Sequence, residues 1–417
     1  MNSDLSSSNQ PTVAPPGPMS RRARFAAALQ HKQPDRPPFD IGATCPMSWL
    51  RDQKGLADFL GLPGEPRPVG AWGFDERIME WADADFRGTG RIVELPGPHS
   101  RTISPMSYVN CWGIRWEFID DEWQITGHPL EGVEDMAALQ SFPWPEPRVD
   151  EALLATWVDE ARSLRARGDH VVLAEHPVLG VMELGAWMFG YETYLYALAA
   201  EPDLVRHFND RVLEIQLEVV RQYYGALGPY IDFTISGDDF GTQQSPIVSP
   251  TMFGEMIAPW FRERIRLTKE IARCPYWHHS CGSIFDLLDQ ILDCGVDIIN
   301  PVQTSAAGMD PAALKKTFGD RVVFWGGMDV QQLLRTATEE TVRLRTRELV
   351  GILGHNGGYV MAPTHEIGRD IPFENIVAWV EEMRAIKQEQ APSSPGHSLH
   401  PPDQQSLPAS GEPFKSF

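Results

Sequence analysis

The sequence predicts an α/β protein built as a (β/α)₈ TIM barrel. After residue 150, short apolar runs alternate with amphipathic segments, which indicates parallel strands joined by crossover helices. Five or six such units within about 220 residues, preceded by an N-terminal start, fit a barrel of eight strands. The alternative is a doubly wound open sheet, but no G-x-G-x-x-G follows any predicted strand, which argues against it.

The first part of the chain is less regular than the rest. A helix is predicted over 21–31, with Ser20 as its N-cap. A first barrel strand is predicted near Pro38–Ile41. Because the remainder of 32–150 is rich in Trp, Gly and Pro, we interpret it as a decorated, partly antiparallel insertion.

From residue 171 onward, strands and helices are predicted in alternation. The predicted strands are 171–174, 230–235, 276–280, 296–300, 321–325 and 358–362. The predicted helices lie near 181–188, 191–200, 203–226, 250–273, 284–292, 311–318, 329–354 and 372–386.

Both ends of the chain are predicted to be disordered tails. Residues 1–18 and 390–417 are rich in Pro, Ser, Gly and Gln, so neither buries enough apolar area to offset its ordering entropy. Residues 19–389 are then expected to form a single domain.

Composition excludes several classes of function. The 36 Lys plus Arg residues against 57 Asp plus Glu give a net charge of −21, which repels nucleic acid and anionic membranes. Five cysteines in 417 residues argue against a disulfide framework and for a reducing compartment. We find no apolar run of about 18 residues and no secretory signal, so a cytoplasmic location is expected.

Polar residues follow five consecutive predicted strands. In a barrel of this kind the active site lies at the C-terminal ends of the strands. Because the strands themselves are apolar, we interpret the five segments as the rim of one pocket for a small-molecule substrate. They are 236–239 (SGDD), 278–282 (HHSCG), 300–303 (NPVQ), 326–329 (GGMD) and 363–366 (PTHE).

The sharpest feature of this rim is the pair His279-x-Cys281. Residues two apart on a strand point to the same side, so the imidazole and the thiol can hold one ion. Zn²⁺ favours such a mixture of nitrogen and sulfur ligands. His365, at the end of the last strand, is the predicted third ligand. The alternative is a buried cysteine beside a hydrogen-bonded histidine.

Other rim residues have two interpretations each. Asp238 and Asp239 form a Gly-Asp-Asp turn, yet one carboxylate can act as an acid or base, bind substrate or orient a metal-bound imidazole. Asn300 and Gln303 can donate to a substrate oxygen, although Asn-Pro also starts turns. His278 is predicted to face the opposite side of its strand and to serve packing.

Together these residues resemble the uroporphyrinogen decarboxylase superfamily, a set of (β/α)₈ barrels. The resemblance runs from residue 21 to about residue 386. Its strongest segments are 238–249 (DDFGTQQSPIVS), 279–303 (HSCGSIFDLLDQILDCGVDIINPVQ), 324–329 (FWGGMD) and 361–375 (MAPTHEIGRDIPFEN). The resemblance also makes a homodimer an option, since members of the family are often dimers.

The superfamily contains metal-free decarboxylases and zinc-dependent methyltransferases that work with a corrinoid protein. The decarboxylases' Met-Arg-Gln-Ala-Gly-Arg segment is missing, because Pro38–Met47 (PFDIGATCPM) stands in its place. His279-x-Cys281 matches the methyltransferases' zinc motif. Their third ligand is a Cys in Ala-Pro-Gly-Cys-Gly, where this chain has His365.

The resemblance therefore implies a zinc-dependent methyltransferase that moves a methyl group between a corrinoid and an ether, amine or thiol. One zinc per chain is expected on His279, Cys281 and His365, with Asp238 or Asp239 catalytic. We find no corrinoid-carrying D-x-H-x-x-G, so the corrinoid is expected on a separate protein or free. The predicted substrate-binding residues are Asp40, Gln243, Asn300, Gln303 and Glu366.

Two alternatives remain open. One is a cofactor-independent decarboxylase or related lyase acting on a carboxylate, with Asp239 or Asp40 stabilising a protonated intermediate. The other is a barrel that binds a tetrapyrrole or a partner without turnover.

Overall fold

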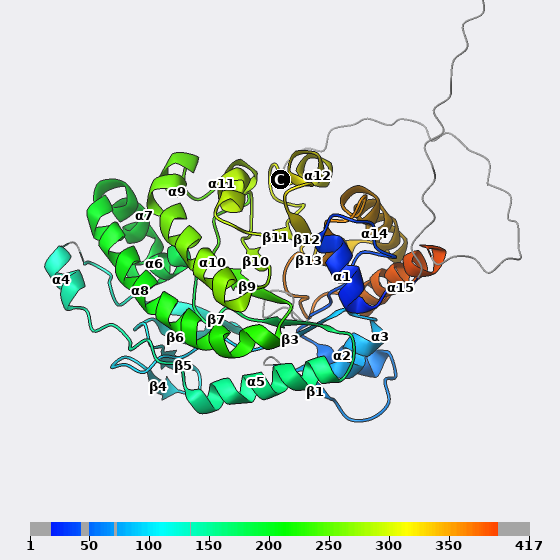
Figure 1. Ribbon diagram of the computed structural model, residues 1–417, viewed down its shortest axis with the longest axis horizontal. Helices are drawn as coiled ribbons and strands as arrows, with labels where there is room; N and C mark the ends of the chain where they lie inside the picture. The colour runs from blue at the N-terminus through cyan, green and yellow to red at the C-terminus, as the bar shows by residue number, and fades with distance from the viewer. Residues whose placement is uncertain (1–17, 43–49, 71–72, 134, 391–417) are drawn as a thin grey trace, which may run out of the picture.

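The computed structural model describes residues 18–42, 50–70, 73–133 and 135–390 (Figure 1). Most of the two predicted tails, 1–17 and 391–417, lies outside the described residues. The predicted start of the C-terminal tail, residue 390, is the last residue of helix α15.

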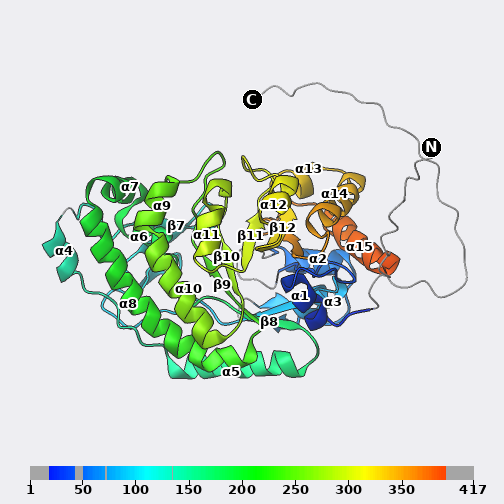
Figure 2. The ribbon, with the colours of Figure 1, turned by 45° about the horizontal axis from the view of Figure 1, so that its top comes forward.

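Seven parallel strands form the curled central sheet, in the order β13-β12-β11-β10-β9-β8-β3 (Figure 2). With helices around it, this sheet forms an α/β TIM barrel, as predicted. The strands are β3 (Phe86–Thr89), β8 (Val171–Ala174), β9 (Phe233–Gly237), β10 (Tyr276–His279), β11 (Ile298–Val302), β12 (Val323–Met328) and β13 (Tyr359–Pro363). Their residues are almost all buried, which explains why these strands, apart from β3, are mostly apolar.

The ring closes through the segment around Phe39, where the first barrel strand is predicted. Phe39 forms a parallel bridge with Met361 of β13. The Asp40 N–H donates to the Met361 carbonyl at 3.0 Å, and on the other side the Asp85 N–H donates to the Phe39 carbonyl at 2.9 Å. This segment thus occupies the eighth position, between β13 and β3.

The region 32–150 is partly the predicted insertion and partly barrel. A four-stranded antiparallel sheet, β4-β5-β6-β7, is inserted as expected. Its strands are Arg101–Ser104, Ser107–Val109, Arg115–Ile119 and Glu122–Gly127, and a small pair comprises β1 (Pro68–Val69) and β2 (Phe74–Asp75). Assigning the whole region to the insertion is wrong at β3, a barrel strand with the sequence FRGT. It is missed because Arg87 and Gly88 break the apolar pattern. The buried guanidinium of Arg87 pairs with Glu76 at 2.9 Å and also donates to the carbonyls of Ala84 and Phe86.

Helix α1 (Arg21–Leu29) begins where predicted, because the Ser20 hydroxyl accepts the Ala23 N–H at 3.2 Å. The predicted helix over 250–273 is divided at Ile257 into two helices, and the helices predicted to span 329–354 are two, separated at Ala337. The other helices are α2 (Gln53–Phe59), α3 (Glu76–Trp81), α4 (Met136–Ser141), α5 (Glu151–Ala166), α6 (Val181–Phe189), α7 (Tyr191–Ala200), α8 (Pro202–Leu227), α9 (Pro250–Met256), α10 (Ala258–Ala272), α11 (Leu288–Asp293), α12 (Pro311–Phe318), α13 (Leu333–Thr336), α14 (Glu339–Leu353) and α15 (Phe373–Gln390).

Helices α8 and α10 pack together along one side of the barrel, and α14 and α15 pack together on the other (Figure 1). Predicted strand starts are two or three residues early at β9, β11 and β12. At β9 the reason is a 3₁₀ turn over Gly228–Tyr230. Among the described residues, no helix combines the length and apolar character needed to cross a membrane.

A buried ion cluster supports the closure of the ring. Asp85 is fully buried and accepts three hydrogen bonds: from Arg24 at 2.5 Å, from Arg36 at 2.6 Å, and from the Phe39 N–H at 2.7 Å. Removing one partner of such a cluster leaves uncompensated charges in a medium of low polarity. Asp85 therefore connects α1, the Phe39 segment and β3.

We predict that Asp85→Ala lowers the free energy of unfolding by about 3–5 kcal/mol, because the buried guanidinium groups of Arg24 and Arg36 each lose one of their carboxylate partners. Urea denaturation of the purified protein measures the change. The control is Asp58→Ala, which removes the exposed pair between Lys54 and Asp58 and should change stability by less than about 1 kcal/mol. Equal effects of the two substitutions would contradict this role for Asp85.

Candidate active site

A cavity of about 240 Å³ lies at the C-terminal ends of the strands, where a barrel of this kind places its active site. It combines carboxylates, imidazoles and an indole, and among the residues that the structure describes no lysine or arginine lines it. The main polar and aromatic side chains around it are Glu175, His176, Glu183, Trp187, Asp239, His279 and His365.

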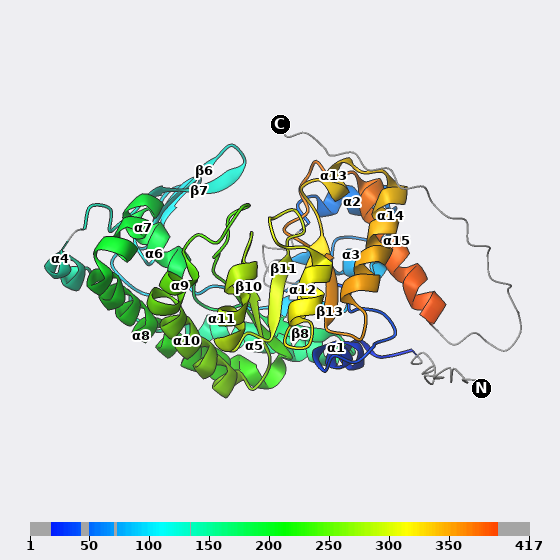
Figure 3. The same ribbon diagram turned by 90° about the horizontal axis from the view of Figure 1, so that it is seen from above.

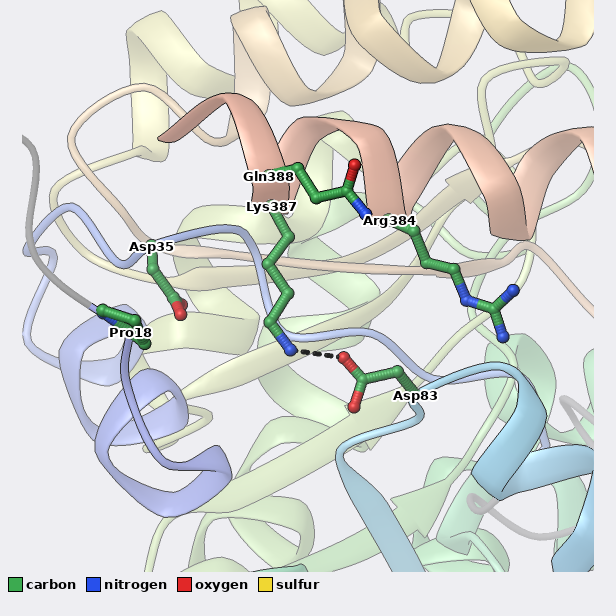
Figure 4. Close-up of a pocket in the computed structure, with 6 residues that line it drawn as sticks. All are labelled: Pro18, Asp35, Asp83, Arg384, Lys387 and Gln388. Carbon is green, nitrogen blue, oxygen red and sulfur yellow. Dashed lines mark hydrogen bonds and ion pairs between the residues drawn. The ribbon is translucent and has the colours of Figure 1, made fainter. Parts of the chain in front are cut away.

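A larger cavity of about 390 Å³ lies beside α15 and contains a different kind of chemistry (Figure 4). It is near the N-terminal ends of the strands, and its charged groups form ion pairs: Lys387 with Asp83 at 2.6 Å and Asp35 with Arg24 at 2.6 Å. These pairs support the ion cluster around Asp85, and we assign this cavity no catalytic role.

The three predicted metal ligands lie together at the strand ends. His279 is the last residue of β10, Cys281 follows it, and His365 follows β13. One ligand atom from each lies within 4.8 Å of the others, and His279 Nε2 is 3.2 Å from Cys281 Sγ. Strands β10 and β13 are separated by two strands in the sheet, so it is the curl of the barrel that brings their ends together.

Asn300 orients the imidazole of His279. The Asn300 side-chain N–H donates to the Trp325 carbonyl at 3.4 Å, so its Oδ1 is the acceptor that lies 2.6 Å from His279 Nδ1. His279 Nδ1 therefore carries the proton, and the lone pair of Nε2 points toward Cys281. This is the usual arrangement behind a metal-binding histidine.

The loop that carries Cys281 is held by two predicted site residues. Asp239 accepts the Cys281 N–H at 2.7 Å, and its carboxylate also lies 3.7 Å from His279 Nε2. Gln303 accepts the Gly282 N–H at 2.7 Å. Glycine is required at 282, because its φ is +84° and a Cβ would lie 2.5 Å from the Thr242 carbonyl. Asn300 thus orients the imidazole of His279, and Gln303 holds the backbone of the loop that carries Cys281.

Burial disfavours the charged forms of the ligand groups when no cation is present. It raises the pKa of the Cys281 thiol well above its usual range and lowers the pKa of His279. A neutral thiol next to a neutral imidazole is a site that releases one proton when a divalent cation binds. The donor set of two imidazoles and one thiolate fits Zn²⁺ with one position left for substrate.

The two neighbouring aspartates have different surroundings. Asp239 borders the cavity, whereas Asp238 is fully buried behind it. The Asp238 carboxylate accepts the N–H groups of Met182 and Glu183 at 3.0 and 2.8 Å and so caps α6. Burial raises the pKa of Asp238 to about 6. Its geometry is that of a residue that positions α6.

None of the five predicted substrate-binding residues lines the cavity. Asn300 and Gln303 lie behind it, where they contact His279 and Gly282. Asp40 is fully buried and accepts the Gly42 N–H at 3.0 Å. Glu366 forms a bidentate pair with Arg51 at 2.5 and 2.9 Å. Gln243 is exposed on the surface. Of the segment 38–47 that replaces the decarboxylase motif, residues 43–47 lie outside the described residues.

Residues at the end of β8 and on α6 complete the cavity, and sequence analysis does not find them. Glu175 and His176 follow directly after β8, so the strand-end rule identifies them when it is applied to this strand as well. Glu183 and Trp187 come from α6. Burial and the nearby Asp239 raise the pKa of Glu183 well above its usual value, which favours its neutral acid form.

His278 serves packing, as predicted. Its ring contacts Phe240 and Phe261 with centroid distances of 5.4 and 4.6 Å, and its Nδ1 is 2.9 Å from Ser236 Oγ. The alternation of the strand thus directs one imidazole to the helix layer and the next to the cavity.

Fold and site define the class of protein: a (β/α)₈ barrel with a His/Cys/His cluster at the mouth. The family model described as Uroporphyrinogen decarboxylase (URO-D) matches residues 124–386, so the chain belongs to this family. A uroporphyrinogen decarboxylase from Psychromonas ingrahamii is 33% identical over 99 residues, which are 24% of this chain and 26% of that protein. The chain thus matches only about a quarter of that relative's length.

A solved structure of a methyltransferase from Methanosarcina mazei has the same fold. It superposes with a TM-score of 0.59 over 88% of this chain and 99% of that one, at 17% sequence identity. At this identity the likeness supports the barrel assignment alone.

We predict that Asn300→Ala weakens zinc affinity about 10- to 100-fold, because the proton position and orientation of His279 are no longer fixed. Competition with a chromophoric chelator measures the dissociation constant. Gln243→Ala, on the exposed surface, serves as control and should bind zinc like the unchanged protein. Unchanged affinity in Asn300→Ala would show that the amide does not orient a ligand.

Proposed function

We propose that this protein is a zinc-dependent methyltransferase that moves a methyl group between a small-molecule heteroatom and a corrinoid. The observation that carries the proposal is the convergence of His279, Cys281 and His365, whose ligand atoms lie within 4.8 Å of one another beside a cavity. Family membership and the fold shared with a methyltransferase are consistent with it.

The proposed ligands account for one zinc ion and one open position. A bound zinc ion would act as a Lewis acid on the ether, amine or thiol heteroatom of the substrate. Two neutral imidazoles and one thiolate leave the site with a net charge of about +1, which favours polarisation of a leaving heteroatom. Because the chain has no corrinoid-carrying D-x-H-x-x-G, we propose that a separate protein brings the corrinoid.

The side chains of the cavity have separate roles in this proposal. Asp239 accepts the Cys281 N–H and borders the cavity, where its carboxylate is placed to take a proton from a thiol that is to be methylated. Burial favours the neutral acid form of Glu183, which can donate a hydrogen bond or a proton to the oxygen or nitrogen that a methyl group leaves. His176 Nδ1 lies 3.2 Å from the Val178 carbonyl oxygen and 3.3 Å from the Val178 nitrogen, while its buried Nε2 has no hydrogen-bond partner among the described residues and is available to a substrate.

A second candidate function is decarboxylation without a metal. Two observations favour it: the matched relative is a uroporphyrinogen decarboxylase, and Glu183, whose pKa is raised by burial, lies near Asp239. An acid next to a carboxylate can exchange a proton with substrate carbon after loss of CO₂. Decarboxylation without a metal assigns Cys281 no role. Substitution of Cys281 therefore distinguishes the two candidate functions.

We predict that the purified protein contains about one zinc per chain and that Cys281→Ala lowers zinc content at least about tenfold, because a three-ligand site loses its only anionic ligand. Elemental analysis after gel filtration measures the content. The matched control is Cys274→Ala, which removes a half-buried thiol outside the site and should leave zinc content unchanged.

The reaction is tested on the same samples. Demethylation of methyl ethers and amines in the presence of cob(I)alamin, or methylation of thiols by methylcobalamin, is expected only in zinc-loaded protein. Metal-free protein with full methyl transfer would contradict the proposal. Decarboxylation of a carboxylate substrate that persists in chelator and in Cys281→Ala would support the second candidate instead.

A further inference from the structure

The inserted sheet presents a row of aromatic side chains that begins inside the cavity. Trp187, which lines the cavity, packs edge-on against Trp116 of β6 at a centroid distance of 5.4 Å. Trp116 stacks on Tyr108 at 6.4 Å, and Tyr108 contacts Trp123 at 5.0 Å. Phe118 contacts Trp123 at 5.5 Å. We call these five residues the aromatic row.

The strand register places the aromatic row on one face of the sheet. Tyr108 is paired with Trp116, and Phe118 with Trp123, while residues 116 and 118 are two apart on β6. Because Trp116 contacts Trp187 of α6, this face is the one directed toward the barrel. Figure 3 shows the β6–β7 hairpin extending beyond the helices on its side of the molecule.

The outer end of the row is exposed. Trp123 is 43% exposed, although large apolar side chains of this kind are normally buried. Ile92, which borders the cavity, is 44% exposed. An aromatic surface that continues from a cavity to solvent is typical of a binding surface.

The tip of the hairpin is acidic. Asp120, Asp121 and Glu122 are consecutive and exposed, and Glu122 lies 4.0 Å from Arg51. Arg51 also binds Glu366, the neighbour of the proposed ligand His365. The hairpin tip is thereby linked to the part of the rim that carries the metal cluster.

We propose that the aromatic row and the acidic hairpin tip form the platform on which the corrinoid macrocycle rests. This rests on the proposed function. A cavity of about 240 Å³ admits a small substrate and excludes a corrin ring with its side chains, so the ring must lie outside, at the mouth. The aromatic row runs from Trp187 at the cavity to the exposed Trp123, so a macrocycle lying across the mouth can contact several of its rings, whereas a small substrate inside the cavity contacts only Trp187.

Charge also favours a corrinoid as the molecule that binds to the aromatic row and the hairpin tip. Oxidised cobalt gives the corrin a net positive charge, and the amide side chains on its edge are hydrogen-bond donors. Carboxylates at the hairpin tip and in the cavity complement both features. The aromatic faces provide contact that needs little ordering of flexible side chains.

The test is equilibrium dialysis of the full, zinc-loaded chain with aquocobalamin, followed by the absorbance of the corrin. Trp123→Ala is expected to weaken binding about tenfold, because one exposed stacking surface is lost. Trp123→Phe retains a ring and is expected to keep most of the affinity. Tyr196→Ala, which removes a ring that is 68% exposed on α7, should have no effect.

Equal affinities in Trp123→Ala and the unchanged protein would overturn the platform, as would no binding of aquocobalamin at about 1 mM. The outcomes that contradict the proposed function differ from those that contradict the platform. If the protein holds no zinc and transfers no methyl group, but still loses cobalamin affinity on Trp123→Ala, the platform stands without it. If methyl transfer requires zinc while Trp123→Ala binds cobalamin normally, only the platform is wrong.

Discussion

Closure of the barrel is the constraint on which the candidate site depends. The ligands at positions 279 and 365 come from strands that are not adjacent in the sheet, and only a curled sheet brings their ends within reach of one ion. The Phe39 segment, hydrogen-bonded to β13 on one side and to β3 on the other, completes that curl. A flat sheet with the same sequence would separate the imidazole of His365 from the thiol of Cys281.

Burial then determines the chemistry of the groups that the barrel brings together. The low polarity at the mouth favours the neutral forms of Cys281, His279 and Glu183. A divalent cation compensates this cost for the thiol, because the thiolate gains a direct bond to the ion. The same burial keeps Glu183 able to donate a hydrogen bond. Burial thus favours a site of neutral side chains, and a divalent cation that binds there supplies the charge that stabilises the thiolate.

Much of the fold could be predicted from the sequence, because buried parallel strands are uninterrupted apolar runs. Strand β3 escapes this pattern, since Arg87 is buried through an ion pair with a residue eleven positions earlier. The cluster of His279, Cys281 and His365 could be predicted because its members lie at the ends of strands or just after them. Glu183 and Trp187 could not, since nothing in a local pattern shows that their side of α6 faces the mouth. Which of Asp238 and Asp239 borders the cavity depends on the capping of that helix.

The most direct test of the central claim is X-ray absorption spectroscopy at the zinc edge of the purified protein. The account predicts one sulfur neighbour at about 2.3 Å and two imidazole nitrogens at about 2.0 Å, with a further light atom in the fourth position. A shell without sulfur, a shell with two or more sulfurs, or a protein that takes up no zinc would contradict it.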